Sequence, residues 1–186
     1  VLLLDEPLSA LDLKIRLEME VELRRVHNET GATFVYVTHD QTEALALSDR
    51  IAVLNHGFIE QLDSPTEAYR RPSSAFAARF LGDANVIPIE VRSVLGAEIE
   101  VAVSSHLVRI EPEGGAAAKG LAQLVIRPET IEVTADAEAS GVVPATVLDA
   151  AYRGWGYTYR VAVDGLEDPL KVEAVKNGMS RFEIGS

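Results

Sequence analysis

A short apolar run that ends in two acidic residues constrains the fold more than any other part of the sequence. Val1-Leu2-Leu3-Leu4 is continuously apolar, which predicts a strand buried on both faces of a parallel sheet. Asp5-Glu6-Pro7 follows it, and proline cannot extend a hydrogen-bonded ladder. Because open α/β sheets bind ligands beyond the carboxyl ends of their strands, we expect both carboxylates to lie at a binding edge.

Helical and strand patterns alternate after this run. One helical face carries four apolar side chains: Ile15, Met19, Leu23 and Val26. They predict a helix over about residues 12–29, with Asp12 as the N-cap and Gly31 as the stop. Residues 33–38 are β-branched and aromatic, so they predict a second buried strand, and His39 follows its end.

Shorter elements are predicted up to residue 82. A hairpin is indicated by residues 51–54 and 58–61, which flank Asn55-His56-Gly57. Three short helices are expected over residues 41–47, 66–71 and 74–81. His27 and His56 are predicted to be surface residues.

The pattern changes near residue 84 to short β-type runs separated by glycine and proline. These runs cover residues 87–94, 99–104, 121–127, 142–151, 157–163 and 170–175, with a last run near Phe182. They predict a small all-β sandwich or barrel over residues 83–186, and His106 is expected in a turn. Residues 113–120 are rich in alanine and glycine and read as a surface linker.

Composition excludes several classes of function. The 186 residues contain no cysteine, which removes disulfides, thiolate metal sites and cysteine nucleophiles. No run approaches the roughly 20 apolar residues that a membrane-spanning helix needs. The net charge of −12 argues against a nucleic-acid partner, because such surfaces are normally basic.

The two acids at the first strand end suit phosphoryl chemistry. Asp5 could reach Mg²⁺, directly or through water, and Glu6 could polarise a water that attacks a phosphoryl group. Taken alone, the pair is equally compatible with two solvated acids at a strand end. The following motifs, Leu8-Ser-Ala-Leu-Asp12 and Thr38-His39-Asp40, favour the functional interpretation.

These motifs resemble a known family. Residues 1–12 look like the Walker B strand and D-loop of ABC-transporter ATPases, and residues 36–45 look like their switch-histidine region. The resemblance implies that Asp5 is the magnesium-associated acid and Glu6 the general base or water-orienting carboxylate. It implies that His39 contacts the γ-phosphate of ATP, and that Asp12 is the D-loop acid that works across an ATPase dimer.

Two motifs of that family are missing from the sequence. There is no Gly-x-x-x-x-Gly-Lys-Ser/Thr phosphate loop and no Leu-Ser-Gly-Gly-Gln signature. Both would lie upstream of Val1, so we expect the chain to be the back half of the nucleotide-binding domain, residues 1–82, plus the β domain. Without a cradle for the phosphates, we expect the chain alone not to hydrolyse ATP.

The β region resembles the transport-associated, OB-like domain at the end of many bacterial importer ATPases. The resemblance is carried by residues 80–86, 126–131 and 152–160. Such a barrel can bind a ligand, so Trp155, Tyr157 and Tyr159 could stack on one. Alternatively, these aromatic residues pack the barrel or form a dimer contact, which is the favoured interpretation.

The resulting fold prediction is a partial P-loop NTPase of the α/β class followed by an all-β OB-like barrel. The resemblance implies an ATP- and Mg²⁺-dependent subunit at the cytoplasmic face of the membrane, with a second copy, transmembrane permease subunits and, indirectly, a solute-binding protein as partners. The sequence leans towards the polyamine and iron branch. The alternatives are a regulatory or dimerisation module that carries an ATPase remnant, and a soluble ABC ATPase without transport partners.

Overall fold

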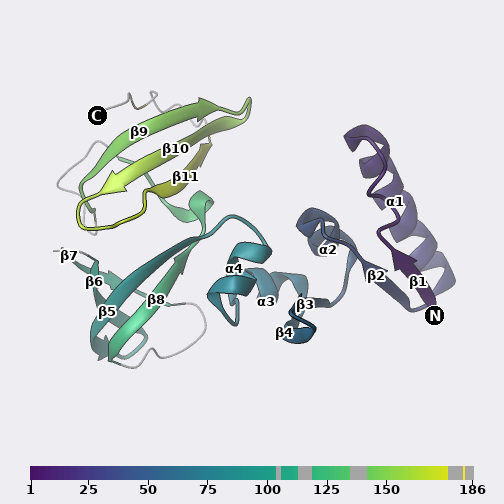
Figure 1. Cartoon of the computed structure of the whole chain (residues 1–186), viewed down its shortest axis with the longest axis horizontal. Helices are drawn as coiled ribbons and strands as arrows, with labels where there is room; N and C mark the ends of the chain where they lie inside the picture. Colours follow the sequence, from purple (N-terminus) through teal and green to yellow (C-terminus); the bar gives the residue numbers. More distant parts are fainter. Residues whose placement is uncertain (104–105, 113–118, 135–141, 176–181, 183–186) are drawn as a thin grey trace. The chain divides into compact units, whose positions relative to one another are not determined.

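The computed structural model describes residues 1–103, 106–112, 119–134, 142–175 and 182, and it divides into two compact units. The first unit is Val1–Gly82 and the second is Asp83–Ser186. Figure 1 labels their helices and strands. Each unit is described by itself below.

The first unit opens with a strand–helix–strand arrangement. Strand β1 (Leu2–Asp5) is followed by helix α1 (Leu13–Thr30) and strand β2 (Phe34–Val37). The two strands pair in parallel and in register from Leu2 opposite Phe34 to Asp5 opposite Val37. This register brings the carboxyl ends of both strands to one edge.

Helix α1 has the ends that the sequence predicts. The Asp12 side chain accepts a hydrogen bond from the Ile15 amide at 3.1 Å, which satisfies a free donor of the first turn. Gly31 closes the helix in the left-handed conformation, at φ 61°, and its amide donates to the His27 carbonyl at 2.9 Å.

The remaining elements of the first unit form a small core of their own. They are α2 (Gln41–Leu47), β3 (Ile51–Asn55), β4 (Phe58–Asp63), α3 (Pro65–Arg70) and α4 (Ala75–Phe80). Ile51, Val53, Ala68 and Leu81 are buried against one another. The predicted hairpin is confirmed: β3 and β4 pair antiparallel around His56 and Gly57, which both have positive φ.

The predicted burial of the first two strands is wrong. Leu3 is 74% exposed in β1, and Val37 is 53% exposed in β2. Among the described residues, β1 and β2 pair only with each other, so no further strand lies beside either of them. His27, predicted at the surface, is half-buried against Phe34, with ring centroids 5.1 Å apart.

The second unit is built of strands, as the sequence predicts. They are β5 (Asn85–Leu95), β6 (Glu98–Val103), β7 (His106–Ile110), β8 (Gly120–Ile126), β9 (Ala145–Tyr152), β10 (Gly156–Val163) and β11 (Leu170–Val175). A short 3₁₀ helix, Pro128–Thr130, follows β8. Four strands form one sheet in the order β7-β6-β5-β8, and three form a second in the order β11-β10-β9.

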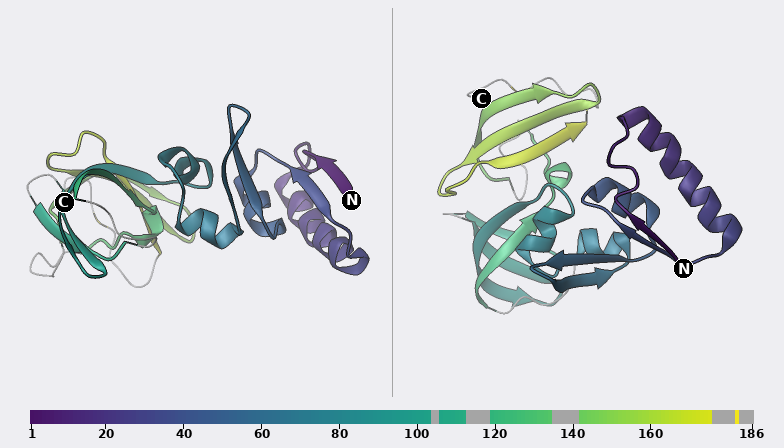
Figure 2. Two further views of the ribbon diagram at one scale, coloured as in Figure 1. Left: turned by 90° about the horizontal axis from the view of Figure 1, so that it is seen from below. Right: turned by 45° about the vertical axis from the view of Figure 1, so that its right-hand side comes forward.

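Each sheet of the second unit has its own apolar core. Alternate residues of β5 and β6 are buried in the first core: Ile87, Ile89, Val91, Ile99, Val101 and Val103. Four residues form the second: Val147, Tyr159, Val161 and Val172. The right-hand view of Figure 2 shows the strands of the second sheet, in green to yellow, side by side.

A buried asparagine joins the two sheets. The Asn85 side chain donates to the Lys171 carbonyl and accepts from the Lys171 amide, both at 2.8 Å. The Asn85 side chain thus makes the two backbone hydrogen bonds to Lys171 of β11 that a neighbouring strand would otherwise make. In the described residues the two sheets do not share a ladder, so the predicted barrel is not closed.

The remaining predictions concern His106, the linker at 113–120 and the run near Phe182. His106 is the first residue of β7, paired with Val103, and the turn predicted for it is wrong. The predicted run near Phe182 and most of the linker at 113–120 lie outside the described residues. None of the helices in the described ranges is long and apolar enough to cross a membrane.

Candidate functional site

The parallel pairing of β1 and β2 brings the predicted acids and the histidine to one edge. The Glu6 amide donates to the Val37 carbonyl at 2.8 Å, which extends the ladder by one residue beyond Asp5. The Glu6 carboxylate then lies 3.1 Å from the His39 Nδ1 atom. Residues 33 positions apart thus meet because Glu6 directly follows the end of β1 and His39 lies two residues after the end of β2.

The backbone at Glu6 is held in an unusual conformation. Its φ of 44° is in the left-handed region, which non-glycine residues seldom adopt and which costs about 1–3 kcal/mol. The Glu6 carbonyl accepts from the Ser9 hydroxyl at 2.9 Å and from the Ser9 amide at 3.3 Å. Such strain is concentrated at functional sites, where the surrounding contacts maintain it.

Asp12 is placed differently from the other predicted site residues. Its carboxylate caps α1, whereas Glu6 and His39 face each other at the strand ends. The structure therefore brings two of the four predicted residues into contact and sets Asp5 beside them at the end of β1. Asp12 begins the helix that follows the same loop.

The donor set at this edge fits magnesium bound together with a phosphate ligand. No group of three or more potential metal ligands occurs among the described residues. A magnesium ion needs only one or two carboxylates, since water and phosphate oxygens fill its other positions. Asp5 provides one such carboxylate, exposed at the strand end.

A polar cluster that sequence analysis missed supports the turn around His39. We call it the Glu43 cluster; it consists of Arg16, Tyr36, Thr38, Asp40 and Glu43. Glu43 is 2% exposed and its carboxylate accepts from the Tyr36 hydroxyl at 2.9 Å and from the Thr38 hydroxyl at 2.8 Å. The Arg16 Nη1 atom donates to the Asp40 carboxylate at 2.9 Å.

Two signals in the sequence point to this cluster in retrospect. Asp40 and Glu43 have the spacing of a helix N-cap and its third helical residue, which marks the start of α2. Arg16 stands four positions after Asp12, on the same side of the helix. Neither signal shows that the arginine and the two acids meet.

The cluster changes the titration of two of its members. Hydrogen bonds from the Thr42 hydroxyl and from the Thr42 and Glu43 amides, with the Arg16 charge, hold the pKa of Asp40 below its ordinary value against partial burial. Partial burial, together with the hydrogen bond to Glu43 and nearby negative charge, raises the pKa of the Tyr36 hydroxyl. The Asp40 carboxylate therefore stays ionised at neutral pH.

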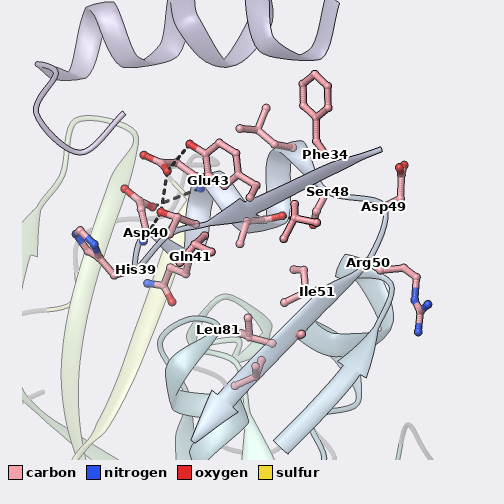
Figure 3. A pocket seen from close by; sticks show the side chains of 18 of the residues that line it. Phe34, His39, Asp40, Gln41, Glu43, Ser48, Asp49, Arg50, Ile51 and Leu81 are labelled. Carbon is pink, nitrogen blue, oxygen red and sulfur yellow. Dashed lines mark hydrogen bonds between the residues drawn. The ribbon is translucent and has the colours of Figure 1, made fainter. Parts of the chain in front are cut away.

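A hollow of about 570 Å³ lies next to the cluster within the first unit. Consecutive residues of β2 and of β3 line it, together with residues of α1 and α2. Figure 3 shows Asp40 and Glu43 at the start of α2, where the Glu43 amide donates to the Asp40 carboxylate, with the His39 ring directed away from them. Apolar side chains such as Ile51 and Leu81 form the opposite wall.

Known proteins are similar to both units of the chain. Residues 124–186 match the TOBE domain. A spermidine/putrescine import ATP-binding protein of Ruegeria pomeroyi is 44% identical over 186 residues, which are 100% of this chain and 50% of that protein. Over its whole length the chain is similar to this import ATP-binding protein.

Other import ATP-binding proteins match the chain to a similar extent. An Fe(3+) ions import ATP-binding protein of Rhizobium etli is 44% identical over 164 residues, 88% of this chain and 45% of that protein. An Fe(3+) ions import ATP-binding protein of Agrobacterium fabrum is 45% identical over 164 residues, which are also 88% of this chain and 45% of that protein. The chain spans about half the length of the curated relatives it matches.

Proposed function

We propose that this chain is part of the ATP-hydrolysing subunit that powers a bacterial ABC solute importer. The observation that carries the proposal is the meeting of Glu6 and His39, at 3.1 Å, at the ends of two parallel strands. The similarity to import ATP-binding proteins, which runs through residues 1–82 as well as the β unit, supports it. It also favours an ATPase over a β module that carries a remnant.

Each residue at the edge has a role in the proposed reaction. Asp5 would hold Mg²⁺, which neutralises charge on the ATP phosphates when bound. Glu6 would accept a hydrogen bond from the attacking water and orient it towards the γ-phosphate. His39 would leave Glu6 and donate to a γ-phosphate oxygen, where charge develops in the transition state. Asp12 would act across the interface of two ATPase subunits.

The free strand edges support the assignment of residues 1–82 to part of a P-loop NTPase sheet. Among the described residues, β2 pairs only with β1, and β3 pairs only with β4. The hollow of about 570 Å³ lies between these two strands. A further strand, contributed by sequence that the longer relatives have, would pair with both edges and cover their apolar side chains.

The proposed partners follow from the role of such a subunit. They are a second copy of the ATPase subunit, transmembrane permease subunits at the cytoplasmic face of the membrane and, indirectly, a solute-binding protein. Similar proteins are named for spermidine and putrescine import and for Fe(3+) ion import. We therefore propose a solute of the polyamine or iron class.

Two substitutions in the complete subunit test the proposal. Glu6→Gln removes the carboxylate but keeps its shape, so ATP should still bind while turnover is nearly abolished. His39→Ala should lower kcat by about 10²–10³-fold through loss of one preorganised donor. ATP binding and steady-state phosphate release at saturating Mg-ATP would be measured for each variant.

Matched controls on exposed residues of the same unit separate these effects from general damage. Glu18→Gln on α1 and His56→Asn in the hairpin turn should leave turnover unchanged, because both side chains lie at the surface. The 186-residue chain without the phosphate loop should release no phosphate above background. Near wild-type turnover in either site variant would refute the roles of Glu6 and His39.

A further inference from the structure

The Arg16 guanidinium contacts the chain on both sides of the candidate site. Its Nη2 atom donates to the Leu11 carbonyl at 3.2 Å, immediately before Asp12. Its Nη1 atom donates to the Asp40 carboxylate at 2.9 Å, immediately after His39. One rigid, planar group therefore bridges the loop before α1 and the turn before α2.

Glu43 gives this bridge its third contact. The Glu43 carboxylate lies 3.8 Å from the Arg16 Nε atom, and its side chain is only 3% exposed. That nitrogen is buried and has no hydrogen-bond partner within the described residues. Electrostatic attraction to the Glu43 carboxylate therefore offsets the cost of removing it from water. A buried carboxylate needs such a cation close by, because transferring a lone charge out of water is costly.

The same cluster determines the backbone on either side of His39. The Thr38 hydroxyl donates to Glu43 and accepts from the Asp40 amide at 2.9 Å. Asp40 in turn caps α2 by accepting from the Thr42 amide at 2.8 Å. The His39 side chain is 71% exposed, so packing does not hold its ring. Apart from the contact with Glu6, the backbone of the turn sets the position of the ring, and hydrogen bonds of the cluster hold that turn.

We propose that Arg16 is a positioning residue that clamps the loop carrying Asp12 to the turn carrying His39. The clamp keeps the loop before α1 and the turn after β2 in a fixed relation. This inference rests on the proposed function, and it deepens it by assigning the orientation of His39 to a residue on α1. A purely structural ion pair would instead change stability and leave the turnover of folded molecules unaltered.

The first test compares two arginines of the same helix in the complete subunit. Arg16→Lys keeps the charge, but a compact ammonium group cannot span the Leu11 carbonyl, Asp40 and Glu43 together. We expect kcat to fall about 10–100-fold, the usual loss when a residue that orients a site group is replaced. The KM for ATP should stay within about threefold, since the clamp does not contact ATP. Arg25→Ala, which removes only the exposed pairs with Glu22 and Glu29, should leave kcat unchanged.

The second test asks whether Arg16 acts through His39. If it does, the double variant R16K/H39A should lose no more turnover than H39A alone, because the clamp has no histidine left to position. Losses that multiply in the double variant would overturn the proposal. Unchanged kcat in folded R16K would overturn it as well.

A measurement that needs no turnover separates this proposal from the proposed function. Hydrogen exchange of the amides in residues 38–43 should be faster in R16K than in wild type or R25A. Equal exchange in all three proteins would overturn the clamp. If the wild-type subunit hydrolyses no ATP, the proposed function fails, while the exchange comparison still decides whether Arg16 holds the turn.

Discussion

Glu6 and His39 leave 46% and 71% of their side chains exposed, whereas Glu43, four residues after His39, is almost fully buried. Exposure suits groups that must meet a ligand and move relative to each other. Burial suits a group that fixes a turn, because its hydrogen bonds are then protected from exchange with water. At the scale of single residues, the candidate site is therefore a pair of free side chains on a fixed support.

Asp40 belongs to this support, and its charge gives a testable pH dependence. Its pKa in the folded protein is below its ordinary value of 3.8, so ionisation stabilises the fold above that value. The contribution is lost as the pH falls through the lowered pKa and both states become protonated. Asp40→Asn keeps an N-cap acceptor but carries no charge.

We therefore expect the wild type to unfold at a higher temperature than D40N at neutral pH, with a difference that shrinks below about pH 4. Circular dichroism melts between pH 3 and pH 7 would measure it. A difference that stays constant or grows on acidification would contradict the assigned role of the Asp40 charge.

At the scale of elements, α1 connects the loop after β1 with β2 and carries both Asp12 and Arg16. Asp12 caps the helix, and the proposed function gives it a second, separable role across a subunit interface. The cap needs a side-chain oxygen, whereas the proposed interface role concerns its charge. Asn and Ala substitutions at this position can therefore distinguish the tasks.

Asp12→Ala should destabilise the protein by about 0.5–2 kcal/mol, because it removes the acceptor for the Ile15 amide. Asp12→Asn should retain most of that stability while changing turnover of the complete subunit. Ser74→Ala, which removes the cap of α4, is the control: it should cost similar stability without changing turnover. Urea unfolding and phosphate release measure the two effects. Equal stability of D12A and wild type would show that the cap does not matter.

Gly156, the first residue of β10, gives a second prediction at this scale. A Cβ atom at this position would lie 2.3 Å from the Ala174 carbonyl oxygen on β11, which is backbone and cannot rotate away. We expect Gly156→Ala to destabilise the β unit by about 1–3 kcal/mol through overpacking. Gly96→Asn should be nearly neutral, since its surroundings are open and asparagine tolerates positive φ. Thermal unfolding compares the two, and equal melting temperatures would refute the close approach.

At the scale of the whole molecule, the two units have separate cores, and each retains features suited to association. Among the described residues of the β unit, β7, β8 and β9 are outer strands with no strand on one side, while the outer edge of β11 bonds Asn85 at Lys171. Leu121 on β8 is 93% exposed, and Trp155 and Tyr152 near the β9–β10 turn are 50% and 57% exposed. Aromatic side chains and free strand edges are common elements of protein interfaces.

We therefore expect residues 83–186 to pair with a second copy through this unit. Light scattering at several concentrations should show the molar mass rising from one copy to two. The isolated β unit is needed, because the exposed apolar residues of β1 and β2 are a second source of association. A strict monomer at about 100 μM would rule out a pairing of useful affinity.

The sequence by itself determined the features that depend on neighbouring residues. The caps of α1, the hairpin at His56 and Gly57 and the end of β1 at Asp5 are all local, because their backbone conformations are set within a few positions. The sequence also predicted that Asp5 and Glu6 follow one strand and that His39 follows another, but the contact between Glu6 and His39 came from the structure. The order of these motifs was enough to indicate the family.

Only the tertiary structure decided which of these side chains meet and which are buried. The contacts of Arg16 with Asp40 and Glu43 join residues on different helices, and no pattern along the chain encodes them. The same holds for Asn85 and Lys171, which join two sheets across 86 positions. An apolar run predicts a strand, but its burial depends on layers supplied from elsewhere, and Leu3 is exposed because only β2 lies beside its strand in the described residues.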